Sequence, residues 1–78
     1  MPPTVTHWTS RGVFRIEPRI LAGSLWCALF LDDQELAVFE MPWTAAKSLH
    51  AGDFDDKIGF SAADAGVPAD WNAWNRLR

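Results

Sequence analysis

The stretch from Ser24 to Leu49 constrains the fold more than any other part of the chain, because it predicts a β-hairpin that leads directly into a helix. Two apolar runs flank a polar segment, residues 32–35, in the manner of two strands joined by a turn. Pro42 suits the first turn of a helix, where its missing N–H would have no partner, and Gly52 suits the position after the last turn. Since a helix of about nine residues is not stable alone, we expect it to pack on the sheet.

The register of this hairpin is predicted from its polar segment. No glycine is present to favour the tightest turn, so we expect a loop slightly longer than two residues, with Asp33 and Gln34 at its tip. The resulting strand pairs are Leu31 with Leu36, Phe30 with Ala37, Leu29 with Val38 and Ala28 with Phe39.

Both faces of the predicted hairpin are largely apolar, although a two-layer domain requires only one apolar sheet face. The second face must therefore meet another segment or another molecule. Uncovered apolar surface marks partner sites, and tryptophan is enriched at binding hot spots. The residues expected to carry such a contact are aromatic: Trp71, Trp74 and whichever of Trp26, Phe30 and Phe39 remain exposed. The alternative is that all of this apolar surface is buried in the core of a monomer.

The segments before the hairpin add a third strand. Residues 13–17 alternate in the pattern of a strand, which predicts a three-stranded antiparallel meander. An extra edge piece around residues 5–8 is an option, and residues 1–10 are the part of the domain expected to fray.

The segment after the hairpin ends in an aromatic helix or turn. Asp70 is a suitable N-cap for a helix from Trp71 to Arg78, and its tryptophans, three residues apart, share a face. We expect this segment to cover the second face of the hairpin. Residues 1–78 thus form a single α+β domain, in which the meander packs against one short helix.

The composition argues against several classes of protein. The chain has a net charge of −3 and one cysteine, so neither a strong general attraction to nucleic acid nor an internal disulfide is expected. Burial of the five Trp and five Phe residues is expected to stabilise the domain instead. No run is long enough for a membrane span, and the first ten residues lack a signal-peptide pattern. We expect a cytoplasmic protein with no membrane partner and no cofactor.

The acidic and histidine residues do not match known ligand patterns. Asp53, Asp55 and Asp56 lack the central glycine and distal glutamate of a calcium loop, so a structural loop is the simpler interpretation. His7 and His50 are far apart in sequence and belong to no spaced ligand pair. No metal site is predicted.

Two further residues could carry chemistry. Glu40 lies on an otherwise apolar face, where a buried carboxylate could act as a general acid or base, or could sit at the sheet margin. Cys27 lies among apolar neighbours, which is typical of an inert buried thiol. We do not expect an enzyme.

An arginine strip in the N-terminal third suggests an alternative function. Arg11, Arg15 and Arg19, with Trp8 as a stacking ring, could grip single-stranded nucleic acid. Two or three phosphate contacts would give weak, salt-sensitive binding, so nucleic acid is the less favoured partner.

The C-terminal half resembles small uncharacterised bacterial proteins in which a strand leads to a short helix with paired alanines, then Gly-x-aromatic-Asp and a closing Pro and Trp. The matching residues are Phe39, Ala45, Ala46, Gly52, Phe54, Asp55, Pro68 and Trp74. This resemblance implies a bacterial or phage-type origin and assigns no residue roles. The leading hypothesis is a non-catalytic accessory module that binds a protein, either a dedicated partner or a second copy of itself.

Overall fold

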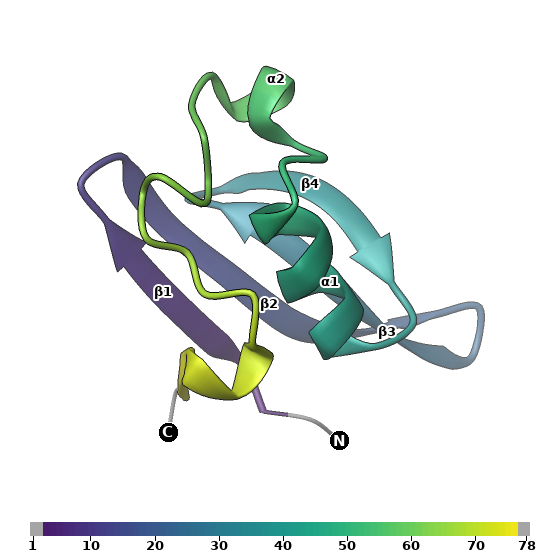
Figure 1. Ribbon diagram of the computed structural model, residues 1–78. Coiled ribbons are helices and arrows are strands. Elements are labelled where there is room, and N and C mark those ends of the chain that lie inside the picture. The colour runs from purple at the N-terminus through teal and green to yellow at the C-terminus, as the bar shows by residue number, and fades with distance from the viewer. Residues whose placement is uncertain (1–2, 77–78) are drawn as a thin grey trace.

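The computed structural model describes residues 3–76 and shows one five-stranded antiparallel sheet with helical segments on one face (Figure 1). The strands are β1 (Val5–Thr9), β2 (Gly12–Leu21), β3 (Ser24–Leu31), β4 (Gln34–Phe39) and β5 (Asn75–Arg76), in the spatial order β4-β3-β2-β1-β5. The helical segments are α1 (Pro42–His50), the single turn α2 (Asp55–Ile58) and the 3-10 turn η1 (Trp71–Ala73). The α+β class is confirmed, while the predicted three-stranded sheet gains two strands, β1 and β5.

Tight turns join the first four strands. In the β2–β3 turn, Ala22 and Gly23 have φ angles of 50° and 81°, a conformation whose twist matches the flanking strands. In the β3–β4 turn, Asp32 adopts φ 52° although it is not glycine. Its N–H donates to the Val13 carbonyl at 2.8 Å, and its carboxylate accepts from the Val13 N–H at 3.0 Å. These two bonds tie the turn to β2 and hold Asp32 in its unusual conformation.

The register of the β3–β4 hairpin differs from the predicted one because this turn is shorter. Leu31 pairs with Gln34 rather than with Leu36, so the loop contains two residues. Leu36 is then an extra residue on β4, and this β-bulge turns its side chain into the core. The pairs beyond the bulge are Leu29 with Ala37, Ala28 with Val38 and Cys27 with Phe39.

The N-terminal segment forms a paired strand. β1 runs antiparallel to β2 from Val5 opposite Ile16 to Thr9 opposite Gly12, so the optional edge piece is confirmed and the expected fraying is wrong for residues 5–9. Gly12 is required at this point, because its φ is 137° and a Cβ there would lie 2.8 Å from a carboxylate oxygen of Asp32. Residues 1–2 lie outside the described part of the chain.

The C-terminal segment is a turn and a short strand rather than a helix to residue 78. The Asp70 carboxylate caps η1 as expected, since it accepts the N–H of Asn72 at 2.9 Å. The chain then leaves the turn, and β5 pairs with the first two residues of β1. This long-range pairing, between residues about 70 positions apart, overrides the local three-residue spacing of the tryptophans. The end of the predicted helix, residues 77–78, lies outside the described residues.

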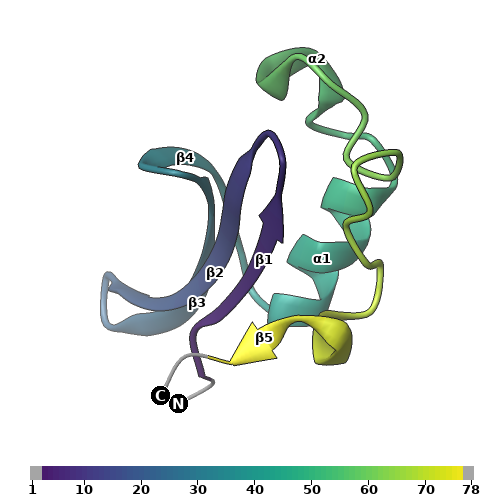
Figure 2. The same cartoon turned by 90° about the vertical axis from the view of Figure 1, so that its left-hand side faces the viewer.

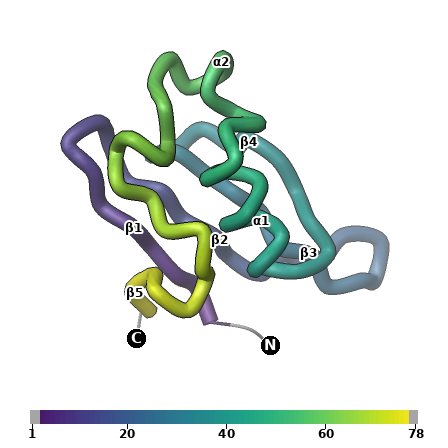
Figure 3. The backbone as a smooth tube through the Cα atoms, viewed as in Figure 1, coloured from purple at the N-terminus to yellow at the C-terminus, as the bar shows by residue number. Residues whose placement is uncertain are grey.

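One face of the sheet carries the hydrophobic core. α1 contributes Ala45, Ala46 and Leu49, which are fully buried against the sheet. The chain after α2 runs back beside α1 and brings Val67 and Trp74 into the same core (Figure 3). The aromatic C-terminal segment therefore covers the helix side, and the prediction that it covers the second face is wrong. Figure 2 shows that the sheet is curved, and within residues 3–76 no helix lies on its other, concave side.

Candidate interaction surface

At one end of the molecule the β2–β3 hairpin extends beyond the helix layer (Figure 1). Exposed apolar side chains lie on this hairpin and at the start of α1. Ile20 and Leu25 face each other across this hairpin and are 57% and 41% exposed. Met41 and Trp43, at the start of α1, are 44% and 51% exposed. We call these four residues the hairpin-end patch. Since exposed apolar side chains that gather in one place mark binding surfaces, this patch is the candidate site.

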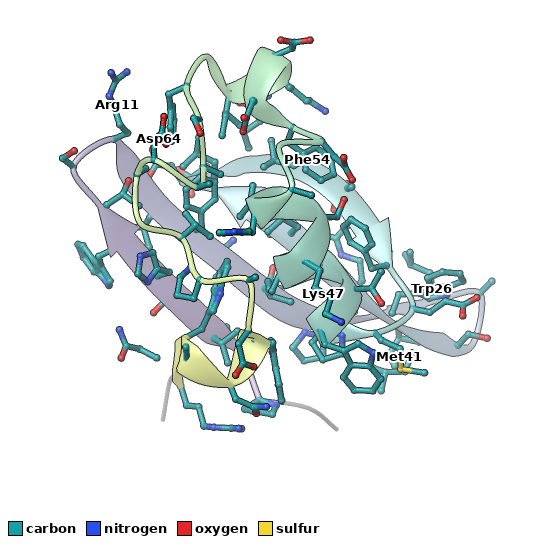
Figure 4. The ribbon with its side chains drawn as sticks, viewed as in Figure 1. Arg11, Trp26, Met41, Lys47, Phe54 and Asp64 are labelled. Carbon is teal, nitrogen blue, oxygen red and sulfur yellow. The ribbon has the colours of Figure 1, made fainter. Side chains whose placement is uncertain are left out.

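The sheet register explains why these residues meet. Cys27 pairs with Phe39, the last residue of β4, and the chain then bends through residues 40–41 into α1, which brings Met41 to the end of the sheet where β3 begins. Pro42, buried, then directs α1 back over the sheet and leaves Trp43 at its outer end. Figure 4 shows Met41 and Trp26 at this same end of the molecule. The patch is thus built where a β-hairpin tip meets a helix start.

Two charged residues flank the hairpin-end patch. Glu40 immediately precedes Met41, and Lys47 lies one helical turn after Trp43 on α1. Both side chains are exposed, and neither forms an ion pair with any residue in the 3–76 range. The patch therefore has one free negative and one free positive charge at its margin.

The second face of the sheet is covered by the protein's own arginines. Phe30, on this face, is only 8% exposed. The guanidinium carbons of Arg15 and Arg19 lie 4.4 Å and 5.4 Å from the centroid of its ring, close enough for cation–π attraction. Arg15 lies 3.5 Å from Glu17, and Arg19 forms an ion pair with Glu35. The apolar surface of the hairpin around Phe30 is thus covered by side chains of the same chain.

The aromatic residues predicted to bind a partner are dispersed. Trp74 is 3% exposed, and its indole N–H donates to the Pro68 carbonyl at 3.1 Å, so it is a core residue. Phe39 packs edge-on against Phe54 beside the core, and Trp71 is half-buried beneath Arg76. Half-buried Trp26 shares the concave face with Phe30. Trp74 and Phe30 are buried and cannot contact a partner without rearrangement. Trp71, Trp26 and Phe39 are half-buried, and their role in binding a partner stays a prediction.

Sequence reasoning missed the residues of the hairpin-end patch. One signal was available: residues 20–31 contain no charged side chain. A turn at Ala22 and Gly23 within this run places apolar side chains on a hairpin tip, where no other element covers them.

The arginine strip is divided by the fold. Arg15 and Arg19 lie on the concave face, where their charges meet carboxylates. Arg11 lies in the β1–β2 turn, with its guanidinium 5.4 Å from the ring of Phe60, which packs against the core. Trp8 is 72% exposed, and the arginines that share its side of the sheet within residues 3–76 are the two paired ones, Arg15 and Arg19. The arrangement does not present the continuous basic surface that nucleic acid requires.

The acidic residues after α1 stabilise loops. Asp53 accepts a hydrogen bond from the Ser48 hydroxyl at 2.5 Å, and Asp55 accepts from the backbone N–H of Ala62 at 3.0 Å. No group of three or more potential metal ligands occurs within residues 3–76. An open hollow of about 420 Å³ next to this region lies between the β1–β2 turn and residues 59–65, and its charged lining residues are Arg11 and Asp64. Glu40, the acid–base candidate, is exposed and lies outside this hollow.

Comparisons with protein-family models, with curated protein sequences and with solved structures found no match to this chain. Among the described residues, no helix is both long enough and apolar enough to cross a membrane.

Cys27 is expected to be a slow nucleophile. It is buried in the core, and burial raises the pKa of its thiol above the ordinary value of 9.0. The reactive thiolate is therefore scarce at neutral pH in the folded protein. We expect labelling by an aromatic disulfide reagent to be slow in buffer and complete within the mixing time in concentrated guanidinium chloride. Equal rates in the two conditions would contradict a buried thiol.

The same shift gives a pH dependence. A group whose pKa is higher in the folded state favours folding below its unfolded pKa, and this contribution is lost as the pH rises above that value. We therefore expect stability to fall above about pH 9, and to fall less in Cys27→Ala.

Proposed function

We propose that this protein is a small interaction module that works by binding another protein through the hairpin-end patch, and not by catalysis. The observation that carries the proposal is the gathering of Ile20, Leu25, Met41 and Trp43 at one end, each more than two-fifths exposed. Exposing apolar surface costs solubility, and a surface of this kind with a polar margin is typical of protein-binding sites.

The position of Trp43 supports this assignment. Tryptophan is among the residues that contribute most to binding when a partner desolvates it. Here it lies on the first turn of α1, an element fixed by the buried side chains of Pro42, Ala45 and Ala46. A rigid support lowers the entropy lost when the side chain is immobilised in a complex.

The residues that could act chemically have other roles in the fold, which also supports binding over catalysis. Cys27 lies in the core, Asp53 and Asp55 hold loops, and the His50 ring nitrogen Nδ1 lies 2.8 Å from the Val67 carbonyl. These contacts account for Cys27, Asp53, Asp55 and His50 without invoking a reaction.

Site-specific photo-cross-linking tests the proposal. A benzophenone amino acid at position 43 is expected to give discrete protein adducts when the full chain is irradiated in an extract of cells that express it. The matched control carries the same group at position 56, which is exposed on α2 at the other end of α1. Adducts at position 43 alone support the proposal, while no adduct, or equal adducts at both positions, would overturn it.

A further inference from the structure

We propose that the partner of the hairpin-end patch is a second copy of this chain, arranged about a two-fold axis so that each patch covers the other. This inference rests on the proposed function and adds the identity of the partner.

Charge complementarity at the patch margin carries the inference. In a two-fold interface the same surface is used twice, so a contact between residue i and residue j is accompanied by one between j and i. Glu40 immediately precedes the patch residue Met41, and Lys47 follows the patch residue Trp43 by one helical turn; both side chains are exposed and neither is paired within residues 3–76. When two patches meet antiparallel, Glu40 of each copy faces Lys47 of the other. Two ion pairs form, and no like charges are placed opposite each other.

The composition of the patch centre fits the same arrangement. The two segments that carry the patch, residues 20–25 on the hairpin and 41–43 at the helix start, contain no ionisable side chain. A charge-free centre with charges only at the rim is the pattern of protein interfaces. The overall charge of −3 on each copy opposes association, so the attraction must be local, and the two Glu–Lys pairs supply it.

The size of the surface indicates a weak dimer. A stable interface buries about 800 Å² on each partner, whereas four partly exposed apolar side chains supply a few hundred Å². The dissociation constant is therefore expected in the range of about 10 μM to 1 mM, which corresponds to about 4–7 kcal/mol. The protein would be a monomer when dilute and a dimer when concentrated.

Charge reversal tests the geometry. Molar mass is measured by light scattering from about 10 μM to about 1 mM, the range set by the expected affinity. Wild type is expected to pass from monomer to dimer. Glu40→Lys alone and Lys47→Glu alone each place two like-charged pairs in the interface and should weaken dimerisation about tenfold. The double variant restores opposite charges and should recover most of the wild-type affinity.

Two controls separate surface effects from unfolding. Trp43→Ala should abolish the dimer, while Trp8→Ala, which removes an exposed tryptophan outside the patch, should leave it unchanged. Circular dichroism checks that each variant is folded. A wild-type monomer at every concentration would overturn the inference, and so would a dimer that the single charge reversals do not weaken.

The failure of this inference is distinguishable from the failure of the proposed function. Photo-cross-linking at position 43 gives an adduct of twice the chain's mass if the partner is a second copy. Adducts only with other proteins would overturn the dimer and leave the interaction module standing.

Discussion

Trp74→Ala is expected to unfold most of the protein at room temperature. The indole is 3% exposed, contacts His7 at 6.0 Å between ring centroids, and bonds the Pro68 carbonyl. Removing a buried tryptophan side chain costs about 3–5 kcal/mol, while a domain of this size has only a few kcal/mol of stability. Urea unfolding followed by circular dichroism measures the loss.

The matched control is Trp8→Ala. Trp8 is the same residue type but projects from β1 into solvent, so we expect a change within about 0.5 kcal/mol. If both variants unfold at similar urea concentrations, the C-terminal segment does not close the core in the way described.

Phe30→Ala is the second variant with a large expected effect. It removes the one ring on which two guanidinium groups rest, on a face that no helix covers. We expect a loss of about 3 kcal/mol from the deleted side chain, measured again by urea unfolding. Phe30→Leu keeps an apolar side chain of similar reach and should lose about 1 kcal/mol.

A double-mutant cycle gives this prediction a sharper form. Arg15→Ala should cost less in the Phe30→Ala background than in wild type, because the ring that its guanidinium contacts is already gone. The coupling is expected to be about 0.5–1 kcal/mol, since the side chains are partly exposed. Additive effects would mean that the arginines cover the face without contributing attraction.

Elements with local signals could be predicted from the sequence. α1 begins at Pro42 and ends two residues before Gly52, whose φ is 93°, as expected for a helix with those flanking residues. β3 and the first half of β2, residues 13–17, follow from the alternation of their side chains, whereas β2 continues through Pro18 to Leu21, beyond the predicted strand. In each case the residues that specify the element lie within it or beside it in sequence.

Features set by distant contacts could not be predicted in this way. The hairpin register depends on Asp32 holding a left-handed conformation through bonds to Val13, which is 19 residues away. β5 also depends on a distant contact, because it forms by pairing with the free edge of β1.

The candidate site shows a related limit. In the sequence, the arginines and the apolar second face indicate two separate binding surfaces. In the structure, Arg15 and Arg19 lie on the ring of Phe30, so the arginines and this part of the apolar face cover each other. The apolar side chains that stay exposed are those of the sheet that α1 and the C-terminal segment do not cover. The periodicity of the sequence alone does not indicate how far that cover extends.

The pairing of β5 with β1 has a consequence for the order of folding. β1 to β4 are joined by tight turns, so each pairing closes a short loop at small entropic cost. Val5 meets Arg76 only after a loop of about 70 residues has closed. The meander and α1, which follows β4 directly, are therefore expected to form early, with part of the core face uncovered until Trp74 docks. During that interval the folding chain exposes apolar surface of the sheet that could associate with other chains. Docking of the C-terminal segment, with Trp74 and β5, buries this surface and so protects the chain from aggregation.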